Sequence, residues 1–136
     1  MVRYKILEHI SDLKIKVFGR DKRELFENAM LGMFKGGGYE RELDSEDIKR
    51  EISVTSSNFF SLLVDFLSEV LYLSEVHQEV YYNIQFKKFN DKNIEGVLLG
   101  KKLKRVRVII KGVTYHDLEV SQRRDGSWEA TILFDI

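Results

Sequence analysis

The sequence contains no cysteine, which excludes a disulfide framework and a thiolate metal site. It also contains no proline, and with its many charged residues this is compatible with a thermophilic source. The net charge is zero because 22 basic residues offset 22 acidic ones, which argues against general binding to nucleic acids or membrane surfaces. No apolar run approaches the roughly 18 residues of a membrane-spanning helix, and no signal peptide is recognisable. We therefore expect a cytoplasmic protein with no membrane contact, whose contact with RNA is indirect or weak.

The chain is long enough for one hydrophobic core, since it has 136 residues of which 43% are apolar. No linker, repeat or low-complexity stretch divides it, so we expect a single domain over residues 1–136. We expect this domain to be a monomer or a weak oligomer.

Apolar residues at helical spacing predict two helices. The first begins at Asp21, with Glu24 in a capping-box-like position, and ends at the glycines 36–38; the second is capped by Ser56 or Ser57. Alternating apolar and polar residues predict strands over residues 2–6, 13–17, 48–54, 80–86, 94–99, 103–110, 113–120 and 128–136. This order predicts the α+β class, with a mostly antiparallel curved sheet packed on two helices.

Candidate metal ligands lie near both ends of the sequence. Asp135 and Ile136 follow the last predicted strand, where a side-chain carboxylate and a terminal carboxylate would be held close together. His9 and Asp12 lie at the break between the first two strands. Clustered carboxylate oxygens are the ligands that a hard cation prefers.

Taken separately, these residues have ordinary structural interpretations. Asp12 is typical of an Asx-turn, His9 of a hydrogen-bonded residue beside a turn, and Asp135 of a surface carboxylate at a strand end. For Asp12 the spacing alone favours the turn role over the metal role. Only convergence in space would make the residues a site, and the sequence leaves convergence open.

A basic run occupies residues 101–111. A regular strand would place Arg105, Arg107 and Lys111 on one face, either as a protected edge or as a contact for phosphate or an acidic partner. Asp65 and Glu69 share one face of the second helix, for which we favour a solvated surface.

The block from Lys111 to Val120 contains further candidates. Gly112 inside a strand indicates a bulge or a close backbone approach, while Lys111 and His116 have side chains suited to acid–base or phosphate roles. No serine nucleophile motif, HExxH pair or phosphate loop accompanies them. The absence of these motifs favours an accessory protein over an independent enzyme.

These segments together resemble the archease family over almost the whole chain. The resemblance rests on residues 9–12, the turn at Gly19-Arg20-Asp21 with residues 25–29, the helix of residues 62–73, the block of residues 111–120 and the ending Leu133-Phe134-Asp135-Ile136. The sequence departs from the family at Ile10 and Ser11, where threonine and alanine are usual, and matches poorly over residues 96–105.

The resemblance implies an enzyme activator that promotes guanylylation and multiple turnover of the GTP-dependent tRNA-splicing RNA ligase. It implies a divalent metal site of Asp12, Asp135 and Ile136, for which Ca²⁺ is expected and Mg²⁺ or Mn²⁺ also suit the oxygen ligands. Lys111 matches the family's functional lysine, and we group His9 and His116 with it in partner activation.

Two other functions stay open. The first alternative is a chaperone of RNA-modifying enzymes such as a tRNA methyltransferase, a role also suggested for the family. The second alternative, which we favour less, is a small metal-dependent hydrolase, with Asp12 and Asp135 as ligands and His9 or His116 as the base.

Overall fold

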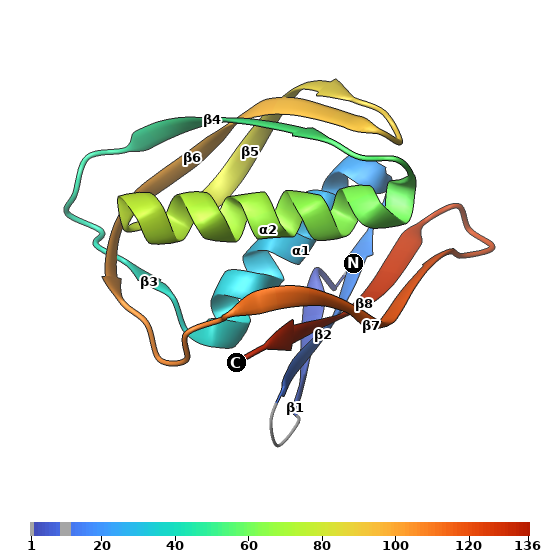
Figure 1. The fold of residues 1–136 in the computed structure, drawn as a ribbon, viewed down its shortest axis with the longest axis horizontal. Coiled ribbons are helices and arrows are strands. Elements are labelled where there is room, and N and C mark those ends of the chain that lie inside the picture. Colours follow the sequence, from blue (N-terminus) through green and yellow to red (C-terminus); the bar gives the residue numbers. More distant parts are fainter. Residues whose placement is uncertain (1, 9–11) are drawn as a thin grey trace.

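The computed structural model describes residues 2–8 and 12–136. The described strands form two antiparallel sheets (Figure 1). Sheet A has the order β1 (Tyr4–Glu8), β2 (Asp12–Gly19), β8 (Trp128–Asp135) and β7 (Gly112–Gln122). Sheet B has the order β3 (Glu40–Arg41), β6 (Asn93–Arg105) and β4 (Ile48–Thr55), and β5 (Glu79–Phe89) also pairs with β6.

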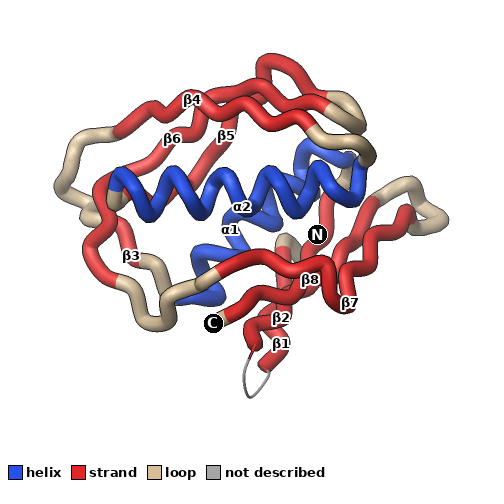
Figure 2. The backbone as a smooth tube through the Cα atoms, viewed as in Figure 1, coloured by secondary structure: helices blue, strands red, loops and turns tan. Residues whose placement is uncertain are grey.

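The helices α1 (Lys22–Gly37) and α2 (Phe59–His77) each pack against strands of both sheets. Helix α1 packs against β2 of sheet A and β5 of sheet B, while α2 contacts β4 on one side and β7 on the other (Figure 2). The core is filled by buried residues from both helices and both sheets, such as Ile15, Phe26, Phe66, Leu98 and Phe134. The predicted α+β class with antiparallel strands and two helices is therefore confirmed, and the strands are divided between two sheets.

Local signals set the ends of α1. The Asp21 side chain accepts a hydrogen bond from the Glu24 N–H at 2.9 Å, and the Glu24 carboxylate accepts one from the Arg20 N–H. Gly38 ends the helix with a φ of 66°, a left-handed conformation that favours glycine. The predicted start and end of this helix agree with the structure.

The start of α2 differs from the prediction. Asn58 is the N-cap and accepts a hydrogen bond from the Ser61 N–H at 2.9 Å. Ser56 instead donates its hydroxyl to the half-buried Asp65 carboxylate at 2.5 Å. One of the two carboxylates expected on a solvated face thus ties the helix to the segment that precedes it.

Strand β6 corrects a second prediction. It runs without a break through Gly100, where the sequence had been divided into two strands, and then leaves the sheet after Arg105. A Cβ at Gly100 would lie 2.5 Å from the Val80 carbonyl oxygen, so this glycine permits close pairing with β5 rather than a turn. Because residues 106–111 lie outside any strand, Arg105, Arg107 and Lys111 do not share a strand face.

Within the described ranges, neither helix is long and apolar enough to cross a membrane.

Candidate functional site

The two predicted aspartates meet at one end of sheet A. Asp12, the first residue of β2, is directly opposite Asp135, the last residue of β8, and Asp135 is also opposite Gly112 at the start of β7. Opposite residues on antiparallel strands point to the same face, with Cβ atoms about 5 Å apart. The convergence that the sequence left open is therefore present for Asp12 and Asp135, and Asp12 is a paired strand residue.

Gly112 keeps the space beside Asp135 open. A Cβ built at Gly112 would meet only one atom within 4 Å, the Asp135 Oδ2 at 3.9 Å. The glycine thus reflects neither a bulge nor a tight backbone contact. It leaves a position without a side chain next to an exposed carboxylate, and this was the role that sequence reasoning missed.

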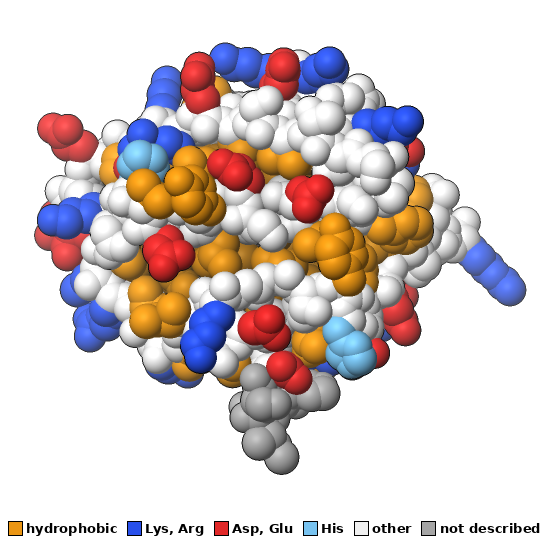
Figure 3. Space-filling model, viewed as in Figure 1, with side chains coloured by type: hydrophobic (Ala, Val, Ile, Leu, Met, Phe, Trp, Pro, Cys, Tyr) orange, Lys and Arg blue, Asp and Glu red, His pale blue; other side chains and the backbone are white. Residues whose placement is uncertain are grey.

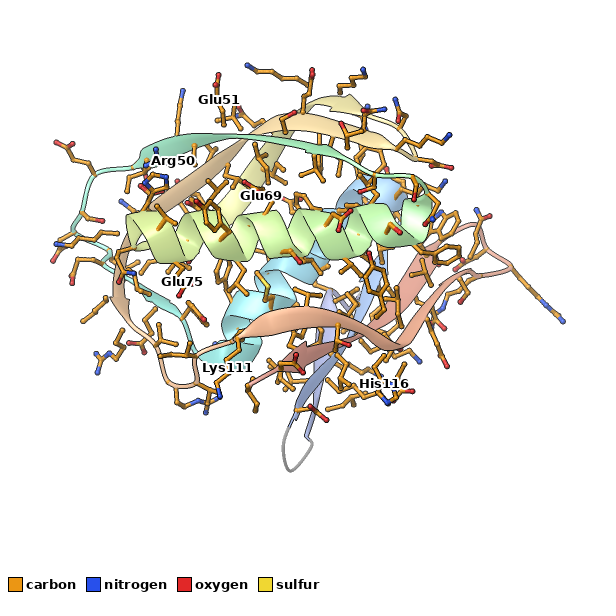
Figure 4. All side chains as sticks on the ribbon, in the orientation of Figure 1. Arg50, Glu51, Glu69, Glu75, Lys111 and His116 are labelled. Carbon is orange, nitrogen blue, oxygen red and sulfur yellow. The ribbon has the colours of Figure 1, made fainter. Side chains whose placement is uncertain are left out.

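Lys111 adjoins the same pair. Its backbone N–H donates to the Asp135 carbonyl oxygen at 2.7 Å, and its side chain is exposed. The hydrogen bond fixes the residue at the point where β7 begins, with its flexible side chain directed away from the core (Figure 4). The backbone of a lysine is therefore anchored to that of Asp135.

The paired aspartates lack a compensating cation among the described ion pairs. Like charges directly opposite each other on neighbouring strands destabilise a sheet, so an external cation would relieve this repulsion. The available donors are oxygens, which suit a hard divalent ion. Residues 2–8 and 12–136 contain no group of three or more His, Asp or Glu side chains placed to hold a metal, so a main-chain or terminal oxygen would be needed to complete a site.

Ile136 and His9 are the other two residues predicted near this pair. Ile136 follows Asp135 directly, and its side chain packs against the hydrophobic core, which holds the residue in place. His9, by contrast, lies outside the described residues.

His116 lies away from the aspartates. It belongs to an irregular stretch of β7 between Thr114 and Glu119, where the pairing with β8 shifts and Asp117 adopts a left-handed φ of 55°. It is four positions along β7 from Gly112, a span of at most about 13 Å. The exposed imidazole, labelled in Figure 4, faces the Asp117 carboxylate at 3.5 Å, and the described ion pairs join it to neither Asp12 nor Asp135.

The basic run is partly neutralised within the fold. Lys101 forms an ion pair with Asp47 at 3.2 Å, and Arg105 pairs with Glu40. Hydrogen bonds from Tyr82 and Lys101 lower the pKa of Asp47. For Lys101 and Arg105, these contacts support the structural interpretation over a phosphate contact.

A second acidic group is built in the opposite way. Glu79 on β5 is only 4% exposed and receives two hydrogen bonds from Arg50, at 3.1 and 2.7 Å, and one from the Tyr81 hydroxyl at 2.7 Å. Burial raises the pKa of Glu79, but the hydrogen bonds from Arg50 and Tyr81 outweigh it and hold the pKa below its usual value. Side chains of the fold itself therefore supply the hydrogen-bond donors and the positive charge that this carboxylate needs.

The fold and the site together define a small α+β protein that presents a carboxylate pair and a lysine at one end of a sheet. A model of the Archease protein family (MTH1598/TM1083) matches residues 4–136. The chain belongs to the archease family.

Relatives and solved structures agree with this assignment. The chain is 38% identical to Protein archease of Methanosarcina barkeri, over 98% of this chain and 96% of the relative, and 28% identical to that of Pyrococcus furiosus over the full length of both. In fold it is similar to the crystal structure of an archease from Thermotoga maritima described as a possible chaperone, with a TM-score of 0.70 and 19% identity over 97% and 96% of the two chains.

Proposed function

We propose that this archease activates a GTP-dependent tRNA-splicing RNA ligase by promoting its guanylylation and repeated turnover. Membership of the family supports an accessory role. The observation that carries the proposal is the row of Asp12, Asp135 and Gly112 across three strands, with Lys111 bonded to Asp135. This row offers oxygen ligands and a cation at one accessible place.

Asp12 and Asp135, with a main-chain or terminal oxygen of Ile136, would hold a divalent ion, and Ca²⁺ is the ion we expect. The space beside Gly112 and the all-oxygen donors fit such an ion, as they fit Mg²⁺ and Mn²⁺. When bound, the ion supplies positive charge that offsets phosphate charge. The role of the two aspartates is to fix its position relative to sheet A.

Lys111 would bind anionic groups of the partner or of GTP. Its backbone is held by Asp135 while its exposed side chain stays free to reach outward. A lysine ammonium is a compact charge suited to phosphate oxygens. Loss of the side chain should therefore reduce activation without disturbing the strands.

The test is GTP-dependent labelling of the RNA ligase from the same organism, with limiting ligase and either Mg²⁺ or Mn²⁺. Addition of the wild-type archease should speed labelling and allow multiple turnover. The variants Asp135→Ala and Lys111→Ala should abolish this gain, whereas Asp117→Asn, which neutralises an exposed aspartate elsewhere on β7, should retain it. Circular dichroism would verify that each variant is folded.

Full activation by both folded variants would refute the assigned residues. No effect of the wild-type protein with any metal, when the ligase itself is active, would refute the proposed activity.

A chaperone of RNA-modifying enzymes is the second candidate. The archease of Thermotoga maritima is described as a possible chaperone, and this chain exposes large apolar residues such as Tyr72, Val76 and Ile109. Such side chains can contact another protein. Recovery of a tRNA methyltransferase instead of the ligase on immobilised wild-type protein would favour this function.

A further inference from the structure

An apolar cleft lies between α2 and the segment that joins β6 to β7. Leu71, Ser74 and Glu75 line it from the C-terminal half of the helix, and Val106 and Ile109 line it from the segment. Its remaining lining residues are Tyr39, Gln78, Leu103 and Ile110. The cleft is thus a gap between a helix and an irregular segment, floored by apolar side chains.

Exposed apolar residues lie on one wall of this cleft and on the adjoining face of α2. Ile109 is 67% exposed, and Tyr72 and Val76, which neighbour the lining residues on α2, are 58% and 54% exposed. Figure 3 shows hydrophobic side chains gathered over this part of the helix and over the segment beside it. Exposed apolar side chains beside a hollow are typical of a protein interface.

The cleft has room for one large apolar side chain. Its volume is about 170 Å³. A cavity of about 150 Å³ is large enough to hold benzene. A phenylalanine or leucine side chain of a partner therefore matches the space.

Glu75 adds a negative charge to the lining of this apolar cleft. Its carboxylate contributes to raising the pKa of Tyr39, which is raised chiefly by burial, so the charge acts on a hydroxyl at the cleft floor. Within the described part of the chain, Glu75 is exposed and belongs to no ion pair. Figure 4 shows it on the side of α2 toward the segment. A partner with a cationic side chain next to its apolar one would complement this position.

Consecutive residues of the chain link the cleft to the carboxylate pair of sheet A. The Tyr39 hydroxyl accepts the Ile110 N–H at 3.0 Å, and the next residue, Lys111, donates its N–H to Asp135 at 2.7 Å. Consecutive residues of one segment therefore form the cleft wall and the edge of the candidate metal site. A partner engaged at one of them is directed toward the other.

We propose that this cleft is the docking site for the RNA ligase, receiving an apolar side chain that is flanked by a lysine or arginine; the identity of the occupant rests on the proposed function. The apolar side chain fills the space between Leu71 and Ile109. The cation pairs with Glu75. Docking there holds the partner against the surface that carries Asp12, Lys111 and Asp135.

The test compares four variants for binding to the purified ligase by calorimetry and for stimulation of its GTP-dependent labelling. Ile109→Asp and Glu75→Lys change the cleft, while Phe60→Asp and Glu69→Lys make matched changes elsewhere on α2. Phe60 is 51% exposed at the other end of the helix, and Glu69 lies on the side toward β4 (Figure 4). The cleft variants should raise Kd by about tenfold or more, and the controls by less than about twofold.

Each result decides between the two proposals. Tight binding by both cleft variants to a ligase that the wild type activates overturns the docking site and leaves the proposed function standing. Binding without activation, lost only in the cleft variants, supports the docking site and overturns the activator function. No binding by the wild type overturns both. A wild-type dimer in sedimentation that Ile109→Asp dissociates would identify a second copy of this chain as the occupant and overturn the ligase.

Discussion

Glu79 and Asp135 are both carboxylates on strands, but their surroundings differ completely. Glu79 is buried with three hydrogen bonds from Arg50 and Tyr81. Asp135 is exposed and is directly opposite a second carboxylate, Asp12, beside a position without a side chain. The fold neutralises the first group internally and leaves the second available to a cation from outside. The comparison separates a carboxylate that maintains the structure from a pair that we assign to function.

The largest effect that tests this comparison is expected at Glu79. In Glu79→Gln the Arg50 guanidinium loses its charged partner, so the free energy of unfolding should fall by about 2 kcal/mol. Chemical denaturation would measure it. Glu51→Gln is the matched control, since Glu51 is exposed on β4 next to Arg50, and it should change stability by less than about 0.5 kcal/mol (Figure 4). Equal effects of the two variants would contradict the structural role of Glu79.

The same contrast should be visible as a pH dependence. The pKa of Glu79 is lowered in the folded protein, so its contribution is present above the ordinary value of 4.5 and is lost as the pH falls through the lower, folded value. The wild type should therefore lose its advantage over Glu79→Gln in acid. Denaturation midpoints of both proteins between pH 7 and pH 3 would show this, and a constant gap would count against it.

A moderate effect is expected from divalent cations. At about ten times Kd, Ca²⁺ should stabilise the wild type by about 1.4 kcal/mol, seen as a rise in Tm of a few degrees. Asp135→Asn should remove the rise, and Asp117→Asn should keep it. The same rise in Asp135→Asn would locate the cation elsewhere and would remove the basis of the comparison.

The smallest effect concerns repulsion without metal. In a chelator, Asp135→Asn should raise the free energy of unfolding by about 0.2–1 kcal/mol, because it removes one of two like charges opposite each other. Lower salt should enlarge the gain if the charges are partly solvated. Destabilisation by this substitution would mean that Asp135 already has a stabilising partner in the folded protein.

The parts of this fold that the sequence predicted are those set by neighbouring residues. The capping position of Asp21 and the stop at Gly38 are local, and both agree with the structure. Residues 100–102 were left between two predicted strands, because the structural reason for Gly100 is its close approach to the Val80 carbonyl of another strand. Arg107 was predicted on a strand because apolar and polar residues still alternate around it, although β6 has already ended at Arg105.

The candidate site was predictable in its residues but not in its geometry. Asp12 and Asp135 each stand at a predicted strand end, yet their meeting depends on the register between β2 and β8. Alternation fixes which face a side chain takes but not which distant residue is opposite it. The resemblance to archeases named these residues, and the open space at Gly112 emerged only from the pairing of three strands.

The position of β8 between β2 and β7 has a consequence for folding of the protein. β8 is contributed by residues 128–135, far along the chain from β2, so β2 has an unpaired edge until this distant strand joins the sheet. Exposed edges invite pairing with other chains, and contacts between distant segments form slowly. Closure of sheet A therefore depends on the arrival of β8. Because that strand also carries Asp135, the two carboxylates come to face each other only when β2 and β8 have paired.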